Sequence, residues 1–214
     1  MIKGIIFDLD GVLLFTDKYH YLAWKALADK FNIPFDEKVN NRLRGVSRME
    51  SLDIILSYSD QKFSEAEKEV MAAEKNELYR EYLKKMTPSD VSDDTRVVLD
   101  KLRERGLKLA IGSSSKNTPL ILEKTDLAKY FHAVSDGNNI SHSKPDPEVF
   151  LKAADYLNLQ PCECIVVEDA EAGIDAGTAG GFLTVGIGCA AQYEKTKYPI
   201  KRLAELLEFP ELTV

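Results

Sequence analysis

Two pairs of acidic residues each follow a short apolar run, Asp8 with Asp10 near the start of the chain and Glu168 with Asp169 further along. Side chains two residues apart in an extended segment point the same way, so Asp8 and Asp10 can face one site. If the two pairs meet, their carboxylates repel one another unless a cation lies among them. Oxygen ligands with no neighbouring His or Cys favour Mg²⁺. The sequence therefore predicts a magnesium site formed by these four acids.

Two other polar segments carry groups that suit a phosphate. The segment 113–117 supplies hydroxyls and backbone N–H groups near a predicted helix start, which favours an anion. Its residues are Ser113, Ser114, Ser115, Lys116 and Asn117. Lys144 comes just before another predicted helix, and a fixed lysine can offset the charge between a carboxylate nucleophile and a phosphoryl group. Together with the acids, these groups indicate phosphoryl transfer.

The predicted elements place all of these groups at the ends of strands. Short continuous apolar runs are typical of strands that are buried on both faces. They occur at Gly4–Phe7, Leu107–Ile111, Cys164–Val167 and Leu183–Ile187, with a weaker fifth candidate at Ala133–Ser135. Amphipathic helices are predicted over Thr95–Arg105, Glu148–Leu157 and Ala170–Ala179. This alternation predicts an α/β fold with a doubly wound parallel sheet, which binds ligands at the carboxyl ends of its strands.

The stretch after the first strand interrupts this alternation, because it carries only helical patterns. Ser47 with Glu50, and Ser64 with Glu67, have the spacing of capping boxes that open two helices. We expect residues 1–15 and 88–214 to form the α/β core and residues 16–87 to form an inserted helical cap. A cap on two connections can close over the edge of a sheet where ligands bind.

Composition narrows the class of protein. The chain has 214 residues and a formal net charge of −7, so an acidic surface makes nucleic acid a poor partner. Three cysteines form no disulfide framework, which fits a reducing cytoplasm. The apolar run at the N-terminus is too short for a membrane span or a signal peptide. We expect a cytoplasmic monomer that binds a small molecule rather than nucleic acid or a membrane.

The order of the four polar segments resembles the haloacid dehalogenase superfamily. Asp8-x-Asp10 resembles its first motif, Ser113 its second, Lys144 its third and Glu168-Asp169 its fourth. The resemblance implies that Asp8 attacks phosphorus and becomes an aspartyl phosphate, while Asp10 serves as general acid and base. It also implies that Ser113 and Lys144 hold the phosphoryl group and that Mg²⁺ is held by Asp8, Glu168, Asp169 and the backbone carbonyl of Asp10.

Within this superfamily the chain resembles the β-phosphoglucomutases along its full length. The similar segments are Thr16-Asp17-x-x-His20, Trp24-Lys25-Ala26-Leu27, the stretch 43–52, Glu74-Lys75-Asn76 and the segment 113–117. That family converts β-glucose 1-phosphate to glucose 6-phosphate through a bound 1,6-bisphosphate, which is also the primer that phosphorylates the enzyme. The resemblance departs at Phe15, where many relatives carry an acid. Phe15 lies in the connection between the core and the cap, so we expect the contacts of this connection to differ while the chemistry of Asp8 and Asp10 is unaffected.

The resemblance to the mutases implies further site residues. Arg48 with Ser115, Lys116 and Asn117 would hold the second phosphate, and His20, with Thr16, would assist Asp10. The sugar pocket would be lined by Trp24, Leu43, Gly45, Val46, Ser51, Lys75 and Asn76, and Ser114 would join the phosphate loop.

Simpler interpretations remain for several of these residues. His20 can be a satisfied surface histidine, and Trp24 can pack in the cap rather than contact a sugar. The helix around Lys75 is charged throughout, which usually indicates a solvated face. For the whole protein, a Mg²⁺-dependent sugar-phosphate phosphatase is the alternative function. A non-catalytic binding protein on the same fold is a third hypothesis.

Overall fold

The computed structural model describes residues 1–43 and 46–209, so the predicted sugar contact Gly45 lies outside the described residues. The chain divides into two compact units. One, here the core unit, comprises Met1–Phe15 and Met86–Val214. The other, here the helical unit, comprises Thr16–Lys85. The expectation that the helical unit, with boundaries at 16 and 87, acts as a cap stays a prediction.

The described residues of the core unit form a parallel sheet with the strand order β3-β2-β1-β4-β5-β6, which confirms the predicted fold class. The strands are β1 (Gly4–Phe7), β2 (Lys108–Gly112), β3 (Ala133–Ser135), β4 (Cys164–Glu168), β5 (Leu183–Gly186) and β6 (Tyr198–Pro199). The edge strand β6 was not predicted. It is two residues long and ends in a proline, so it has no apolar run to mark it, and proline is tolerated at a sheet edge.

Strand β1 lies in the middle of the sheet, between β2 and β4. Phe7 is in register with Ile111 on one side and Val167 on the other. All four residues of β1 are buried, as expected for a strand that is covered on both faces. Because the strands are parallel, the residues that follow β1, β2 and β4 emerge at the same edge of the sheet.

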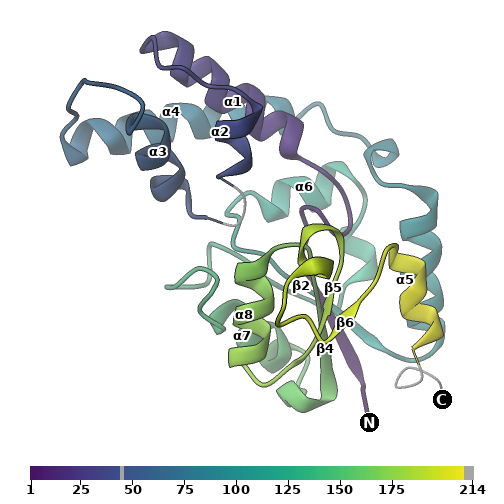
Figure 1. Cartoon of the computed structure of the whole chain (residues 1–214). Helices are drawn as coiled ribbons and strands as arrows, with labels where there is room; N and C mark the ends of the chain where they lie inside the picture. The colour runs from purple at the N-terminus through teal and green to yellow at the C-terminus, as the bar shows by residue number, and fades with distance from the viewer. Residues whose placement is uncertain (44–45, 210–214) are drawn as a thin grey trace. The chain divides into compact units, whose positions relative to one another are not determined.

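Helices cover both faces of this sheet. Helix α7 (Glu148–Tyr156) and helix α8 (Glu171–Ala179) lie side by side on one face, and α5 (Asp93–Glu104) lies on the opposite one (Figure 1). Ile6, Val149 and Phe150 belong to the apolar cluster under α7 and α8. The remaining elements of the unit are α6 (Thr118–Lys124) and the short 3₁₀ helices Pro88–Asp90, Ala128–Tyr130, Pro161–Glu163, Gly188–Gln192 and Leu203–Glu208.

The described part of the helical unit consists of α-helices joined by loops. These are α1 (Asp17–Lys30), α2 (Glu37–Asn41), α3 (Arg48–Leu56) and α4 (Glu65–Leu83). Both predicted capping boxes are present, at Ser47 with Glu50 and at Ser64 with Glu67. The helices share an apolar cluster that includes Trp24, so the unit has a hydrophobic core of its own.

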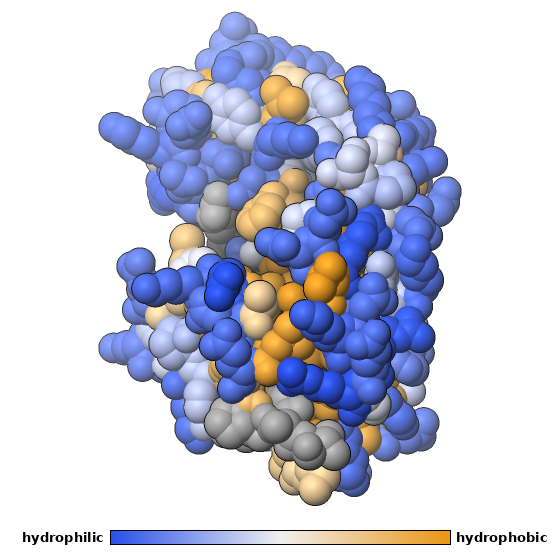
Figure 2. Space-filling view, turned by 90° about the vertical axis from the view of Figure 1, so that its right-hand side faces the viewer, coloured by the Kyte–Doolittle hydropathy of each residue, from blue (hydrophilic) through white to orange (hydrophobic). Residues whose placement is uncertain are grey.

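The surface shown in Figure 2 is mostly hydrophilic, and hydrophobic side chains gather in one smaller area of that face. This agrees with the charged residues, which make up 29% of the chain. Within residues 1–43 and 46–209, none of the helices has the length and the hydrophobicity that a membrane crossing needs.

Candidate active site

The ammonium group of Lys144 bridges two carboxylates at the carboxyl ends of β1 and β4. Its Nζ lies 2.5 Å from Oδ1 of Asp8 and 2.5 Å from Oε1 of Glu168. The side chains are nearly removed from solvent, with exposed fractions of 8% for Lys144, 11% for Asp8 and 2% for Glu168. Residues more than 130 positions apart in the sequence therefore meet in one buried ion-pair network, as the motif order predicts.

Burial and charge act in opposite directions on this network. Burial is the largest influence on Asp8 and raises the pKa of its carboxyl to about 7, while the nearby Lys144 ammonium pulls that pKa down. For Lys144, burial alone would lower the pKa, but Asp8 and Glu168 outweigh it and hold the pKa above its usual range. Lys144 thus stays charged, and it is the group that favours an ionised Asp8.

Backbone groups fix the positions of the two carboxylates. The amide N–H of Asp8 donates to the carbonyl of Val167, which ties the residue after β1 to β4. Oε2 of Glu168 accepts a hydrogen bond from the amide of Ala170 at 2.8 Å. A Cβ at Gly173 would lie 2.0 Å from this carboxyl group, so the first turn of α8 can approach Glu168 only because residue 173 is a glycine.

Asp169 and Asp10 complete the acidic cluster. Burial, followed by the charges of Asp8, Glu168 and Asp10, raises the pKa of Asp169 to about 8. Gly11 has φ of 91°, and a Cβ there would lie 2.1 Å from a carboxylate oxygen of Asp169. The turn after β1 therefore requires glycine, both for its backbone conformation and for the closeness of Asp169.

The cluster has the chemistry of a magnesium site. Burial first, and then the charges of the neighbouring carboxylates, raise the pKa of both Asp8 and Asp169. A cation among the acids would favour their ionised forms. The available donors are carboxylate oxygens, which suit a hard divalent cation. Lys144 and the Ala170 amide engage both oxygens of Glu168, and Lys144 also bonds to Oδ1 of Asp8.

The predicted phosphate loop follows β2 at the same edge of the sheet. The amide of Ser113 donates to the carbonyl of Ser135 on β3. The hydroxyl of Ser113 accepts from the amide of Ser115 at 3.3 Å, and that of Ser115 accepts from the amide of Asn117 at 3.2 Å. Ser113 and Asn117 are buried, Ser114 and Ser115 are partly exposed, and Lys116 is exposed. The loop therefore presents some of its residues to solvent and buries others.

The turn that follows β3 contacts the backbone of the phosphate loop. These contacts were not predicted from the sequence. The amide side chain of Asn138 donates to the carbonyl of Lys116 at 3.0 Å and to the buried carboxylate of Asp136. A Cβ at Gly137 would lie 2.4 Å from the carbonyl oxygen of Ser114. The only sequence sign was an Asp-Gly-Asn run, which indicates a turn but not what the turn contacts.

In the helical unit, several of the predicted residues meet in one cluster. Nζ of Lys75 lies 2.9 Å from Nδ1 of His20 and 4.5 Å from the centre of the Trp24 ring. The hydroxyl of Tyr79 donates to Oγ1 of the fully buried Thr16 at 2.9 Å, and its ring stacks on His20. Lys75 is only 2% exposed, so the alternative interpretation of this lysine as part of a solvated face does not hold. Its contact with a sugar stays a prediction.

The other predicted residues of the helical unit vary in exposure. Ser51 and Leu43 are buried, Val46 is 40% exposed, and Asn76 is partly exposed. Trp24 is buried in the apolar cluster of the unit, which supports its packing role.

Arg48 is the first residue of α3, and burial lowers the pKa of its guanidinium. It lies close enough to depress the pKa of His20 and of Lys75, so three basic groups gather here. In the core unit, Phe15, the position at which the chain departs from the mutases, is 69% exposed.

Comparison with known proteins decides the family. The haloacid dehalogenase-like hydrolase family matches residues 2–181. The chain belongs to this family. The matched range contains Asp8, Ser113, Lys144 and Asp169. It therefore includes the buried ion-pair network described above.

Relatives within the family include both mutases and phosphatases. The chain is 42% identical to a β-phosphoglucomutase of Bacillus subtilis, over 87% of this chain and 83% of the relative. It is 30% identical to a phosphorylated carbohydrates phosphatase of Thermotoga maritima, over 84% of this chain and 82% of that protein. The crystal structure of a β-phosphoglucomutase from Clostridium difficile superposes with a TM-score of 0.88 at 39% identity, over 96% of this chain and 93% of that one.

Proposed function

We propose that this protein is a β-phosphoglucomutase, which interconverts β-glucose 1-phosphate and glucose 6-phosphate through a sugar 1,6-bisphosphate. The observation that carries the proposal is the Lys144 bridge between Asp8 and Glu168, beside Asp169. It occurs in a chain with 42% identity to a β-phosphoglucomutase. A buried carboxylate with a fixed ammonium beside it is suited to attack phosphorus.

In the proposed reaction an oxygen of Asp8 attacks the phosphorus of the bisphosphate. A bond forms between Asp8 and phosphorus, and the bond from phosphorus to the sugar oxygen breaks. The departing sugar oxygen takes a proton from Asp10, which later removes a proton from the hydroxyl that accepts the phosphoryl group. The aspartyl phosphate then transfers its phosphoryl group to the free hydroxyl at carbon 6 of β-glucose 1-phosphate. The bond between Asp8 and phosphorus breaks as the bond from phosphorus to that hydroxyl oxygen forms, and the bisphosphate is regenerated.

Lys144 and Ser113 hold the phosphoryl group in this proposal. Lys144 already lies at the Asp8 oxygen, so its charge opposes the repulsion between the nucleophile and an anionic phosphoryl group. Asp8, Asp10 and Asp169, with Glu168, would hold Mg²⁺. When bound, the ion would neutralise the crowded carboxylates and polarise the phosphoryl oxygens.

The residues of the helical unit enter the proposal as substrate contacts. Arg48 binds the phosphate that is not reacting, and Ser114, Ser115, Lys116 and Asn117 bind phosphate from the core unit. His20, supported by Thr16, assists the proton transfer of Asp10. Contacts with the sugar come from Leu43, Gly45, Val46, Ser51, Lys75 and Asn76, with Trp24 supporting Lys75. A cation at each of the two phosphate positions would distinguish a bisphosphate from a monophosphate.

A sugar-phosphate phosphatase is the second candidate, and the Thermotoga relative favours it. Both reactions begin with the same aspartyl phosphate. They differ in the acceptor, which is a sugar hydroxyl in the mutase and water in the phosphatase.

One paired assay separates the two functions. Purified protein with Mg²⁺, β-glucose 1-phosphate and a trace of the 1,6-bisphosphate should form glucose 6-phosphate with little free phosphate. Free phosphate with little glucose 6-phosphate would establish a phosphatase. Turnover that persists in the Asp8→Asn variant would overturn the assignment of the nucleophile, and Asp126→Asn, at a surface ion pair, is the control.

A further inference from the structure

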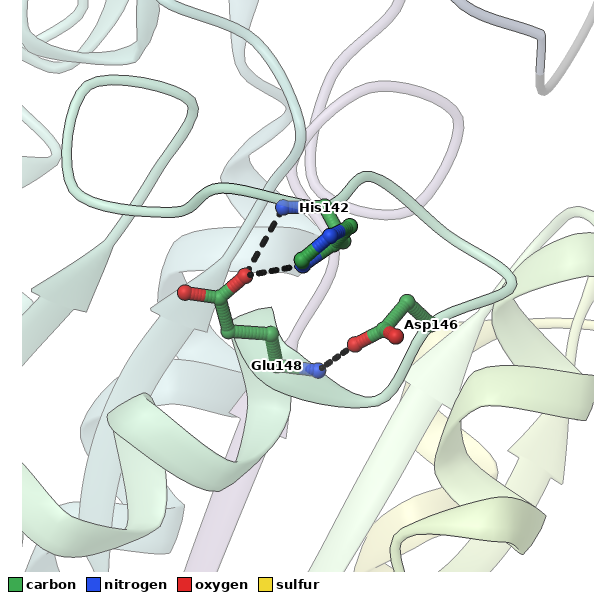
Figure 3. A group of neighbouring side chains, drawn as sticks. All are labelled: His142, Asp146 and Glu148. Atoms are coloured by element: carbon green, nitrogen blue, oxygen red, sulfur yellow. Dashed lines mark hydrogen bonds and ion pairs between the residues drawn. The ribbon is translucent and has the colours of Figure 1, made fainter.

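A cluster of His142, Asp146 and Glu148 lies in the segment that carries Lys144 (Figure 3). Oε2 of Glu148 accepts hydrogen bonds from the backbone amides of Ser141 and His142, each at 2.8 Å. Nδ1 of His142 lies 3.4 Å from the same oxygen. One carboxylate therefore ties the start of this segment to the first residue of α7.

The other partners of Glu148 are also fixed. Its Oε1 lies 2.7 Å from Nζ of Lys152, one turn further along α7. The ion pair with Lys152 and the backbone bond from His142 lower the pKa of Glu148 to about 2. Because a lysine and two amide groups already satisfy this carboxylate, the cluster is better explained as a clamp on the backbone than as a cation site.

The far side of the segment is held as well. Oδ1 of Asp146 accepts from the amide of Glu148 at 2.9 Å, and the amide of Asp146 donates to the carbonyl of Ser143. Lys144 therefore lies between two anchored points, residues 141–142 and residues 146–148. Its side chain must span from this segment to Asp8 and Glu168, so the position of the backbone determines where the ammonium group lies.

We propose that Glu148 is a positioning residue for Lys144, acting through the backbone of residues 141 and 142. This inference rests on the proposed phosphoryl transfer, in which Lys144 offsets charge at Asp8. A displacement of about 1 Å in a reacting group can reduce a rate about 100-fold. Glu148 itself contacts neither Asp8 nor Glu168 among the interactions of the described residues.

The test is phosphorylation of Asp8 by acetyl phosphate and Mg²⁺, followed by mass spectrometry of the intact protein. This small donor needs no sugar contact. Glu148→Ala should slow phosphorylation about 10- to 100-fold. Glu148→Gln, which keeps one acceptor oxygen, should lose less. Asp93→Ala removes the acid from the first residue of α5 and should leave the rate unchanged.

A double variant distinguishes positioning from general stabilisation. If Glu148 acts through Lys144, Glu148→Ala should slow Lys144→Ala no further, because the two changes remove one function. In the Glu148 variants, amide exchange should quicken at Ser141 and His142 but not at Ile5 in β1. The proposal would be overturned if the losses of phosphorylation rate were additive in the double variant. It would also be overturned if Glu148→Ala and Glu148→Gln were both phosphorylated at the wild-type rate.

Failure of the proposed function gives a different result. If the wild-type protein forms no aspartyl phosphate, the proposed function fails. Glu148 then counts as a clamp only if the amides of Ser141 and His142 exchange faster in Glu148→Ala, and unchanged exchange would overturn the clamp as well.

Discussion

Nζ of Lys75 on α4 lies 2.9 Å from Nδ1 of His20 on α1, so two basic side chains share one buried contact. Burial, followed by the charge of Arg48 on α3, lowers the pKa of Lys75 to about 7. The rings of Trp24 and Tyr79 flank the amine. Burial also lowers the pKa of His20 well below its usual value, so the histidine is neutral.

The Lys75 contact predicts that the helical unit becomes more stable as the pH rises. Above about pH 7 the folded state releases the Lys75 proton, whereas the unfolded chain keeps it up to about pH 10. Between these values stability should increase with pH, by up to about 1.4 kcal/mol per pH unit from this one group. Trp24 is the single tryptophan, so urea unfolding followed by its fluorescence reports on this unit.

Substitution isolates the contribution of Lys75. Lys75→Met should reduce the slope of stability against pH between about pH 7.5 and about pH 9.5. The control Lys62→Met, at an exposed position, should keep the wild-type slope. Equal slopes in all three proteins would show that Lys75 keeps its proton in the folded state.

Removal of Lys144 should make the core unit dependent on magnesium. Lys144→Met leaves the buried carboxylates of Asp8 and Glu168 without their cation. Loss of one partner of a buried ion pair costs about 3–5 kcal/mol, and added Mg²⁺ should restore part of this stability. Thermal unfolding with EDTA and with Mg²⁺ measures both effects.

The control for Lys144 is Lys129→Met, which removes a surface ion pair with Asp126. It should change neither the stability nor the response to Mg²⁺ appreciably. If Mg²⁺ raises the unfolding temperature of the Lys144 variant no more than that of the wild type, the acidic cluster does not bind the ion in the expected way.

Gly137→Ala should weaken the binding of sugar phosphates by displacing the phosphate loop. The new Cβ would lie 2.4 Å from the carbonyl oxygen of Ser114 and 2.9 Å from the amide nitrogen of Lys116. Both are backbone atoms of the loop, so the loop must shift, and we expect KM to rise about 10-fold. Gly180→Ala is a control with similar crowding, against Phe182, and should leave KM unchanged.

The sequence was sufficient for strands β1 to β5 and for the meeting of Asp8 with Glu168. Buried parallel strands are marked by continuous apolar runs, so β1 and β4 were predicted with the correct starting residues. Because parallel strands end at one edge, the meeting of Asp8 with Glu168 followed from the order of the motifs. Short elements such as β6 have too few side chains to produce a pattern.

Contacts made through the backbone were beyond sequence reasoning. The bonds from Asn138 to Lys116 and from Glu148 to residues 141–142 depend on the path of each turn, and residue types do not encode that path. The burial of Lys75 was missed for another reason. Charged neighbours dominate the pattern of α4, although one lysine of that helix turns toward aromatic rings.

Arg48→Ala should impair sugar-phosphate binding without affecting phosphorylation of Asp8. Loss of a charge-assisted hydrogen bond to a phosphate costs about 1.5–3 kcal/mol, so KM for the sugar phosphate should rise about 10- to 100-fold. The rate of aspartyl phosphate formation from acetyl phosphate should stay within about twofold of wild type, because that donor has no second phosphate. Arg42→Ala removes an exposed arginine that bonds to Tyr58 and should change neither quantity. If Arg48→Ala leaves KM unaltered, the second phosphate is bound elsewhere. If it slows phosphorylation by acetyl phosphate as much as turnover, Arg48 acts on the reacting phosphoryl group itself.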